Sequence, residues 1–445
     1  MSTASSEHQP PHPHGHGHHH APLGGPPPSP AVAWIRRRAA LLLAAVVVPL
    51  AVATAIGVVL LWPDGKGPQD RRLDTTYSAP GGTIVEGTVA ALRTFDCPGG
   101  EVAPGLPGKE GTLRCVSVRV GLDTGPKAGS EVKVDLPPEV DRAGIAAGDR
   151  MRLLHVAVGP EKTDYYAFVD FVRGTPMAAL AIAYAVVVVA VARLRGLRAL
   201  LGLGFAYLML ASFMLPALLE GKSPLLVGFV GSSAIMFIVL YFAHGLSART
   251  TTALLGTLFG LCVTAALGWW ATDAARLTGL DGDDSFILLA STRTLDLSDM
   301  VLCGIIVAGL GVLNDVTITQ ASAVWELYEL SPSMPARRLF MGAMRIGRDH
   351  IASTVYTIAF AYAGAALPIL LLVTLYERPF LTALTGGELA EEVVRTLVGS
   401  IGLVLAIPIT TAVAVVVAKA AGTAQAANLA PPPGRRIARH AGHTR

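Results

Sequence analysis

Long apolar runs joined by short polar segments dominate this sequence. Most of the apolar residues stand in runs of about twenty, the length that an α-helix needs to cross the hydrocarbon core of a bilayer. Soluble cores do not require such runs, so the pattern predicts an α-helical polytopic membrane protein with about eight transmembrane helices. The predicted spans are residues 39–62, 176–192, 199–219, 223–244, 251–272, 299–320, 351–373 and 397–418.

A polar segment of residues 63–175 separates the first span from the second, and it begins with a linker, Asp64–Pro80. Val116, Val118 and Val120 alternate with polar residues, and alternation of period two indicates half-buried strands. Five short strands separated by Gly and Pro clusters predict a small all-β, OB-like barrel inserted between the two spans. The expected strands are Thr83–Phe95, Thr112–Gly121, Ser130–Leu136, Asp149–Val158 and Tyr165–Val172.

The arginines give the predicted spans an orientation. By the positive-inside rule, their distribution places the N- and C-termini in the cytoplasm and the β-domain outside. The arginines that set this orientation are Arg36, Arg37, Arg38, Arg193, Arg195, Arg198, Arg249, Arg337, Arg338, Arg345, Arg348, Arg435, Arg436 and Arg439. The acidic residues of the opposite connections are Glu220, Asp281, Asp283, Asp284, Glu388, Glu391 and Glu392.

Composition and charge narrow the class further. Hydrophobic residues make up 52% of the chain and charged residues 15%, against about 25% charged residues in soluble domains. The net charge of +3 is small and the arginines are dispersed, so no nucleic-acid partner is expected. The expected partners are the lipid bilayer and a solute or envelope component, while the oligomeric state stays open.

The sequence predicts five consecutive regions along the chain. They are 1–35, a disordered His/Pro/Gly-rich cytoplasmic tail; 36–62, the first helix; 63–175, the β-domain with its linker; 176–420, seven helices; and 421–445, a basic cytoplasmic tail.

The N-terminal tail carries interrupted histidines. Neutral imidazole binds zinc, nickel and copper, so the tail has a predicted weak affinity for these metals, either incidental or serving metal buffering. No cofactor is otherwise predicted. The candidate metal ligands are His12, His14, His16, His18, His19 and His20. Cys97 and Cys115 flank a Pro/Gly-rich loop of the β-domain and form a disulfide if that domain faces an oxidising compartment.

The sixth span holds the polar groups of greatest interest. Asn314 and Asp315 follow a glycine-rich stretch, and Thr317 and Thr319 add hydroxyl groups. Asp315 lies about 24 Å along a helix that starts near residue 299, in the inner part of the bilayer. A carboxylate there must be protonated, paired or exposed to water. One interpretation is a proton or cation relay beside a broken helix; the other is a helix end at the cytoplasmic interface.

Asp349 and His350 precede the seventh span at the same predicted level. Histidine is the side chain type whose charge changes most readily near neutral pH, so His350 is a candidate partner for Asp315. The alternative is a plain interfacial ion pair between Asp349 and an arginine. Residues 321–347, divided by Pro332 and Pro335, have the pattern of an amphipathic elbow of two short helices. The sequence has no nucleophile elbow, Walker loop or HExxH motif, so we do not expect an enzyme.

Four strings of residues resemble the YibE/F family of bacterial multi-pass membrane proteins. These strings are Gly311–Leu327, Arg345–Thr354, Ala361–Pro368 and Val394–Gly402. The resemblance implies a permease of the bacterial cytoplasmic membrane with no assigned substrate and no agreed catalytic residues.

The stretch from Gly311 to Thr317 is also similar, more weakly, to the intramembrane motif of the SecD and SecF export proteins, in which an aspartate or its neighbours serve a proton path. Three hypotheses result from these observations. The first is an ion-driven transporter that uses Asp315, the second is an envelope-assembly or export accessory whose β-domain binds a partner outside, and the third is a non-transporting scaffold.

Overall fold

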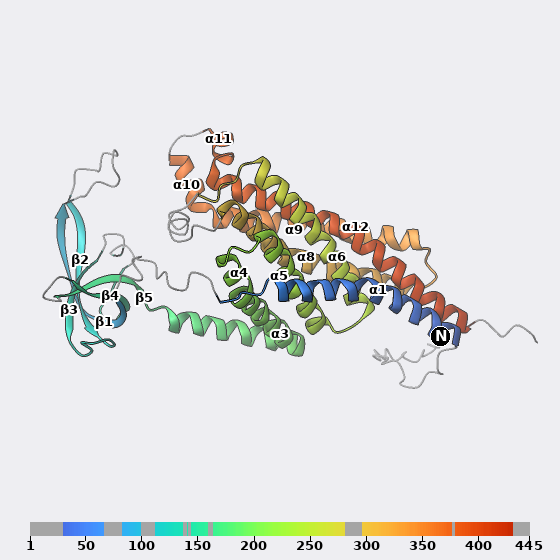
Figure 1. Ribbon diagram of the computed structural model, residues 1–445, viewed down its shortest axis with the longest axis horizontal. Helices are drawn as coiled ribbons and strands as arrows, with labels where there is room; N and C mark the ends of the chain where they lie inside the picture. The colour runs from blue at the N-terminus through green and yellow to red at the C-terminus, as the bar shows by residue number, and fades with distance from the viewer. Residues whose placement is uncertain are drawn as a thin grey trace, which may run out of the picture.

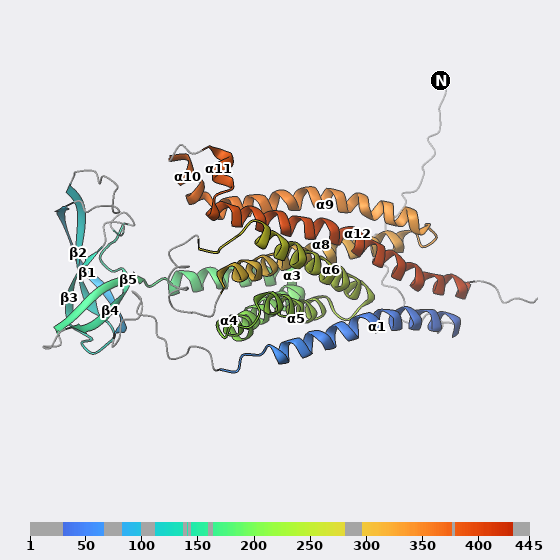
Figure 2. The same cartoon turned by 45° about the horizontal axis from the view of Figure 1, so that its top comes forward.

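The computed structural model describes residues 30–65, 82–98, 112–136, 140, 144–158, 163–280, 296–375 and 379–429. A β-sheet lies at one end of the molecule, and long helices extend from it towards the opposite end (Figures 1 and 2). The N-terminal histidines and the acidic residues Asp281, Asp283 and Asp284 lie outside the described residues.

The sheet contains the five strands that the sequence predicts, with the order β3-β2-β1-β4-β5 and antiparallel pairing throughout. Alternating apolar side chains such as Val118, Val120 and Leu153 fill its buried face, as period-two patterning requires. β3 and β5 approach each other, so the sheet curls into a half-barrel. The strands are β1 (Thr83–Pro98), β2 (Thr112–Leu122), β3 (Glu131–Leu136), β4 (Arg150–Val158) and β5 (Thr163–Phe171).

The curl depends on β1, which pairs with β4 through its first half and with β2 through most of its length. A register shift between Val89 and Ala91 marks a bulge, and bulges bend and twist a strand. Gly87 precedes it at a close approach of two strands. A Cβ atom at Gly87 would lie 2.5 Å from Val120 Cγ1 and 2.7 Å from the Gly121 carbonyl oxygen, so a larger residue does not fit there.

The remaining elements are helical. They are α1 (Pro30–Leu60), α3 (Gly174–Met209), the π-helical turn η1 (Leu210–Met214), α4 (Leu215–Leu219), α5 (Pro224–His244), α6 (Ala248–Ala274), α8 (Leu297–Leu330), α9 (Ala336–Ala365), α10 (Leu367–Leu375), α11 (Phe380–Leu384) and α12 (Gly387–Leu429). α8 and α9 form a long helical hairpin that turns at Ser331–Pro335. The predicted elbow of two separate short helices is therefore wrong. The segment 321–347 instead forms the end of α8 and the start of α9, which meet at the turn.

Two predicted spans lie within the helical segment Gly174–Leu219, which comprises α3, η1 and α4. Arg193 has a positive φ of 53° and breaks the helix. A Cβ atom at Gly196 would lie 2.5 Å from the Val188 carbonyl oxygen, whereas residues eight apart in a straight helix are separated by about 12 Å. The chain therefore reverses at Arg193 and returns towards the sheet through η1 and α4 (Figure 1). Its two limbs match the predicted spans 176–192 and 199–219.

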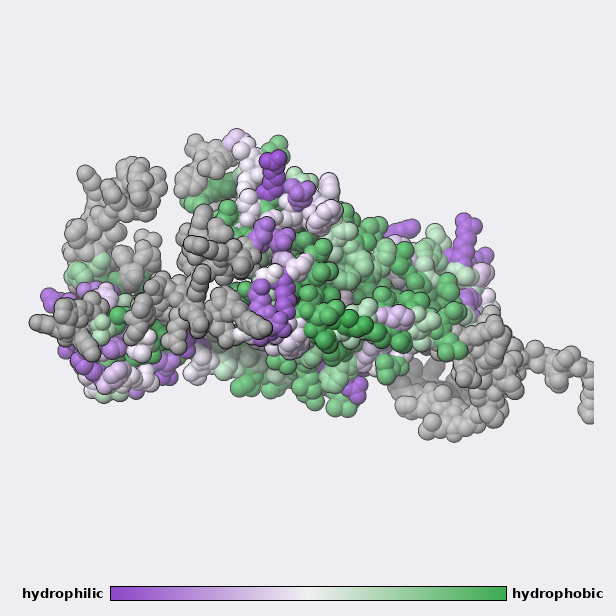
Figure 3. All heavy atoms as spheres, in the orientation of Figure 1, coloured by the Kyte–Doolittle hydropathy of each residue, from purple (hydrophilic) through white to green (hydrophobic). Residues whose placement is uncertain are grey.

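The helices are built for a lipid environment. Six are long and apolar enough to cross a membrane, or seven if α9 and α10, bent by 63°, count as one broken span. The number for the described residues is below the predicted eight because Gly174–Leu219 enters as one helix, although it covers two predicted spans. Large apolar side chains such as Leu180 and Val191 are 73% and 81% exposed, and apolar residues cover much of the helical surface (Figure 3). Exposed apolar area of this extent indicates contact with lipid.

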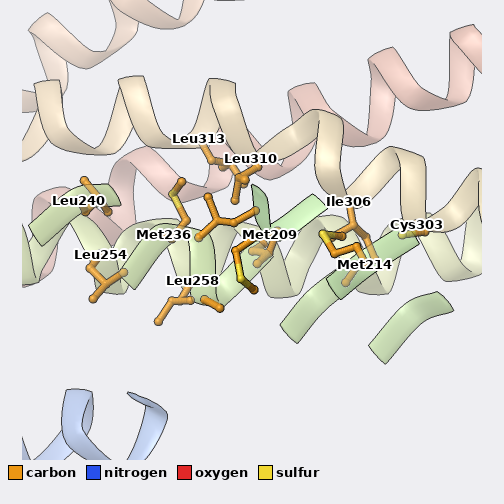
Figure 4. Close-up of a cluster of buried hydrophobic side chains, with 14 of the residues drawn as sticks. Met209, Met214, Met236, Leu240, Leu254, Leu258, Cys303, Ile306, Leu310 and Leu313 are labelled. Atoms are coloured by element: carbon orange, nitrogen blue, oxygen red, sulfur yellow. The ribbon is translucent and has the colours of Figure 1, made fainter. Parts of the chain in front are cut away.

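α6, α8 and α12 pack closely at the centre of the helical region. A Cβ atom at Gly256 would lie 1.9 Å from Thr410 Oγ1, and one at Gly260 would lie 2.5 Å from Leu313 Cδ2. The two glycines, spaced as GxxxG, therefore allow α6 to approach α8 and α12 closely. Beside this centre, Met214 of η1 extends towards Ile306 and Cys303 of α8 (Figure 4).

A polar junction ties the end of α1 to the α4–α5 connection. The Asp64 and Gly65 backbone N–H groups donate to the two carboxylate oxygens of Glu220, at 3.0 and 2.8 Å. Lys222 donates to the Trp62 carbonyl oxygen. The backbone hydrogen bond from Asp64, followed by that from Gly65, lowers the pKa of the Glu220 carboxyl. The predicted loop acid Glu220 therefore anchors the first helix to the others.

Candidate functional site

Asn314 and Asp315 lie in the middle of α8, on different sides of the helix. α8 is continuous through Gly309 and Gly311, so the predicted break does not occur. Gly309 instead allows close packing, because a Cβ atom there would lie 3.2 Å from Thr264 Cγ2. Asn314 is half-buried in the bundle, while the Asp315 side chain is 71% exposed. Successive residues of a helix diverge by about 100°, so the two neighbours face different surroundings.

The structure brings Asp315 and His350 together. His350 Nε2 of α9 lies 3.9 Å from Asp315 Oδ2 of α8. This nitrogen is buried and forms no hydrogen bond within the described part of the chain. A protonated imidazole at this distance attracts the carboxylate, and a small movement of either side chain would bring the two groups into hydrogen-bonding range.

Asp349 and Thr319 do not join this pair. Both are exposed, and no ion pair of Asp349 exists with any described residue. The predicted interfacial ion pair between Asp349 and an arginine is therefore absent from the described structure. Thr319 is separated from the buried face of α8 because it is four residues after Asp315 and shares that residue's exposed side.

Buried polar side chains continue from Asn314 along α8. Thr317 and Gln320 follow Asn314 at intervals of three residues and therefore share its face. Thr317 Oγ1 lies 2.6 Å from Thr257 Oγ1 of α6. Gln320 Nε2 donates to the Ala343 carbonyl oxygen of α9 at 3.0 Å and to Thr411 Oγ1 of α12 at 2.7 Å.

We call Asn314, Thr317, Gln320, Thr257, Thr264 and Thr411 the polar seam. It lies between α6, α8, α9 and α12, and Asn314 Oδ1 and Thr264 Oγ1 are buried without hydrogen-bond partners among the described residues. A Cβ atom at Gly402 would lie 2.2 Å from Thr264 Oγ1, so the α12 backbone closes directly over this hydroxyl. Buried groups without partners are costly, which makes the seam a place where a proton or polar ligand gains interactions.

A charged pair stands near the other end of these helices. Arg395 Nη1 donates to Glu392 Oε1 at 2.8 Å, and both side chains are only about a quarter exposed, at 24% and 26%. Arg395 also faces Gly304 of α8, where a Cβ atom would lie 3.9 Å from Arg395 Nη2. Glu391 and Glu392 belong to α12, which begins at Gly387, and so are not loop residues.

Sequence reasoning missed Gln320, Arg395 and the pairing of Glu392. The signal for Gln320 was its spacing of three from Thr317, which follows Asn314 by three as well. The signal for Arg395 was a charge adjoining an apolar run. Neither signal names the partner, because Thr411, Ala343 and Gly304 come from helices distant in sequence.

The residues of the predicted disulfide and the predicted metal ligands are separate from those of the polar seam and the Asp315–His350 pair. Cys115 is disulfide-bonded, whereas Cys262 and Cys303 are free. Cys97 is two positions from Phe95, the residue that pairs with Cys115, so the backbone register is compatible with the predicted disulfide. The Cys97 side chain lies outside the described residues, and the pairing stays a prediction. No group of three or more metal-binding side chains occurs among the residues that the structure describes.

The apolar helices and their lipid-facing surface define a multi-pass membrane protein. The profile of the YibE/F-like proteins matches residues 180–420, more than half of the chain. The chain belongs to the YibE/F family, which confirms the resemblance carried by its motifs. No curated protein and no solved structure matches it.

Proposed function

We propose that this membrane protein is a permease whose transport is coupled to a proton or cation through Asp315 and His350. The observation that carries the proposal is the 3.9 Å approach of His350 Nε2 to Asp315 Oδ2, with the imidazole nitrogen buried and unpaired among the described residues. Protonation of His350 creates an attraction that neutral His350 lacks, so the distance between α8 and α9 depends on proton binding.

The position of the pair along the helix supports this role. Asp315 lies eighteen residues after Leu297, about 27 Å along α8, in a membrane with a hydrocarbon core of about 30 Å. This distance places Asp315 near the inner edge of the hydrocarbon core, and ionisable residues within membrane helices commonly belong to ion or proton pathways. The polar seam begins one residue away, at Asn314, and offers hydroxyl and amide groups between four helices.

The proposed orientation has the termini in the cytoplasm. The start of α1 and the end of α12 lie at the end of the molecule away from the β-sheet (Figure 2). Together with the arginine distribution, this arrangement favours a cytoplasmic membrane protein whose β-domain faces outside.

The test uses Asp315→Asn and His350→Gln, with Asp349→Asn as the matched control. Asp349 is an exposed carboxylate next to His350 and has no ion pair in the described structure. Accumulation of metal ions and small solutes is first compared between a strain lacking the gene and its parent. The solute whose accumulation differs between the two strains is then followed in membrane vesicles with an imposed proton gradient. We expect gradient-driven flux to fall at least tenfold in the first two variants and to persist in the control; unchanged flux in Asp315→Asn would refute the coupling role.

A further inference from the structure

An open cleft of about 600 Å³ lies where the α3 reversal, the α5–α6 connection and α8 meet. It is separate from the Asp315–His350 pair, since neither residue lines it. Charged and polar side chains from all of these elements form its walls. The lining residues that matter here are Arg195, Arg198, His244, Arg249, Ser322 and Trp325.

The positive charge of this cleft is poorly compensated. Neither Arg195 nor Arg198 forms an ion pair with a residue that the structure describes. Arg249 approaches two exposed carboxylates only loosely, at 3.8 Å from Glu326 and 3.7 Å from Glu329. Glu326 and Glu329 offset the charge of Arg249, whereas the charges of Arg195 and Arg198 stay uncompensated, so these two guanidinium groups leave a net positive field in the cleft.

Hydrogen-bond donors accompany this charge. α6 begins at the cleft, and Ser247 caps it by accepting a hydrogen bond from the Thr250 N–H at 3.1 Å. The first amides of a helix lack intrahelical acceptors, and its dipole favours an anion at this end. Trp325 lines the cleft as well, and its indole N–H is buried with no acceptor in the described structure. A buried donor without a partner is an independent sign that a polar ligand belongs here.

We propose that this cleft is a binding site for a phosphate-bearing anion. Planar guanidinium groups match phosphate oxygens in charge and geometry. The cleft volume falls in the range of about 300–1,000 Å³ typical of small-molecule sites, so the ligand is larger than a phosphate ion alone. Basic pockets between membrane helices also bind phospholipid head groups. A soluble phosphorylated molecule and an anionic lipid share the chemistry that this cleft recognises.

The experiment measures ligand affinity of the full chain in uncharged detergent. The probes are inorganic phosphate, short-chain phosphatidylglycerol, and phosphatidylcholine as the lipid without net charge. Arg195→Gln/Arg198→Gln removes two charges from the cleft. Arg337→Gln/Arg338→Gln removes two charges from exposed positions of α9 that do not line it. We expect at least tenfold weaker binding in the first variant and a change of less than twofold in the second.

The probes separate the two sources of phosphate. Binding of inorganic phosphate supports a soluble ligand, and binding of phosphatidylglycerol alone supports a lipid head group. The absence of binding by both, or equal losses in the two arginine variants, overturns the proposal. If Arg195→Gln/Arg198→Gln does not fold, the ligand affinity of Trp325→Phe tests the site instead. This variant keeps the aromatic ring and removes the N–H donor, so about fivefold weaker binding is expected, and unchanged affinity refutes the site.

Discussion

Replacing Gly256 with alanine tests the packing of the helices at the centre of the membrane region. A Cβ atom there would lie 1.9 Å from Thr410 Oγ1 and 2.9 Å from Thr410 Cβ. Rotating the threonine side chain relieves only the first contact, because Thr410 Cβ is fixed to the α12 backbone. α6 and α12 must therefore separate, and their shared contacts with α8 weaken.

The expected cost follows from two opposing effects. Overpacking a close contact costs about 1–3 kcal/mol, while alanine gains about 1 kcal/mol over glycine inside a helix. Since two atoms of Thr410 oppose the new methyl group, we place the overpacking near the upper limit and expect a net loss of about 2 kcal/mol. For domains of moderate size, such a loss lowers the unfolding midpoint by several degrees.

Gly311→Ala is the matched control, since it makes the same change in α8. Among the described residues, no atom outside the adjoining backbone of α8 lies within 4 Å of a Cβ atom at Gly311, so this variant should be neutral or slightly more stable. Thermal unfolding of both variants in the same detergent measures the difference. Equal midpoints would refute the packing argument, and restoration of stability by adding Thr410→Ala to Gly256→Ala would identify Thr410 as the source of the clash.

Two further variants test polar interactions. Gln320→Leu removes the hydrogen bonds to Ala343 and Thr411 and should cost about 1–2 kcal/mol; unfolding indistinguishable from wild type in detergent would contradict this. In the β-domain, hydrogen bonds from Lys127 and then His155 lower the pKa of Asp164. The stabilisation by Asp164 is therefore complete above its unfolded pKa of about 4 and is lost as pH falls through its lower folded value. Hydrogen exchange of β4 and β5 in wild type and Asp164→Asn should differ at neutral pH, and the difference should shrink as pH falls from about 4 through the lower folded pKa of Asp164. A difference that widens on acidification would exclude this linkage.

The class of protein and its helices could be predicted because the signal lies in the chain itself. A run of apolar residues long enough to cross a bilayer is recognisable without knowledge of its neighbours. The reversal at Arg193 also follows from two such runs separated by a short basic segment. The continuous hairpin of α8 and α9 could not be predicted in the same way. Tyr328, Leu339 and Ala343 are buried in a cluster with residues of α12, and that packing extends both helices past the expected bilayer boundary.

For the candidate site, the sequence by itself determined that Asn314 and Asp315 stand side by side on one apolar helix, with His350 on the next. Only the tertiary structure decided that Asp315 points outward to His350 while Asn314 points inward to the polar seam. It also decided that Gln320 joins α8 to α9 and α12. The physical reason is that helix periodicity assigns residues to faces, whereas the partner of each face depends on how separate helices pack.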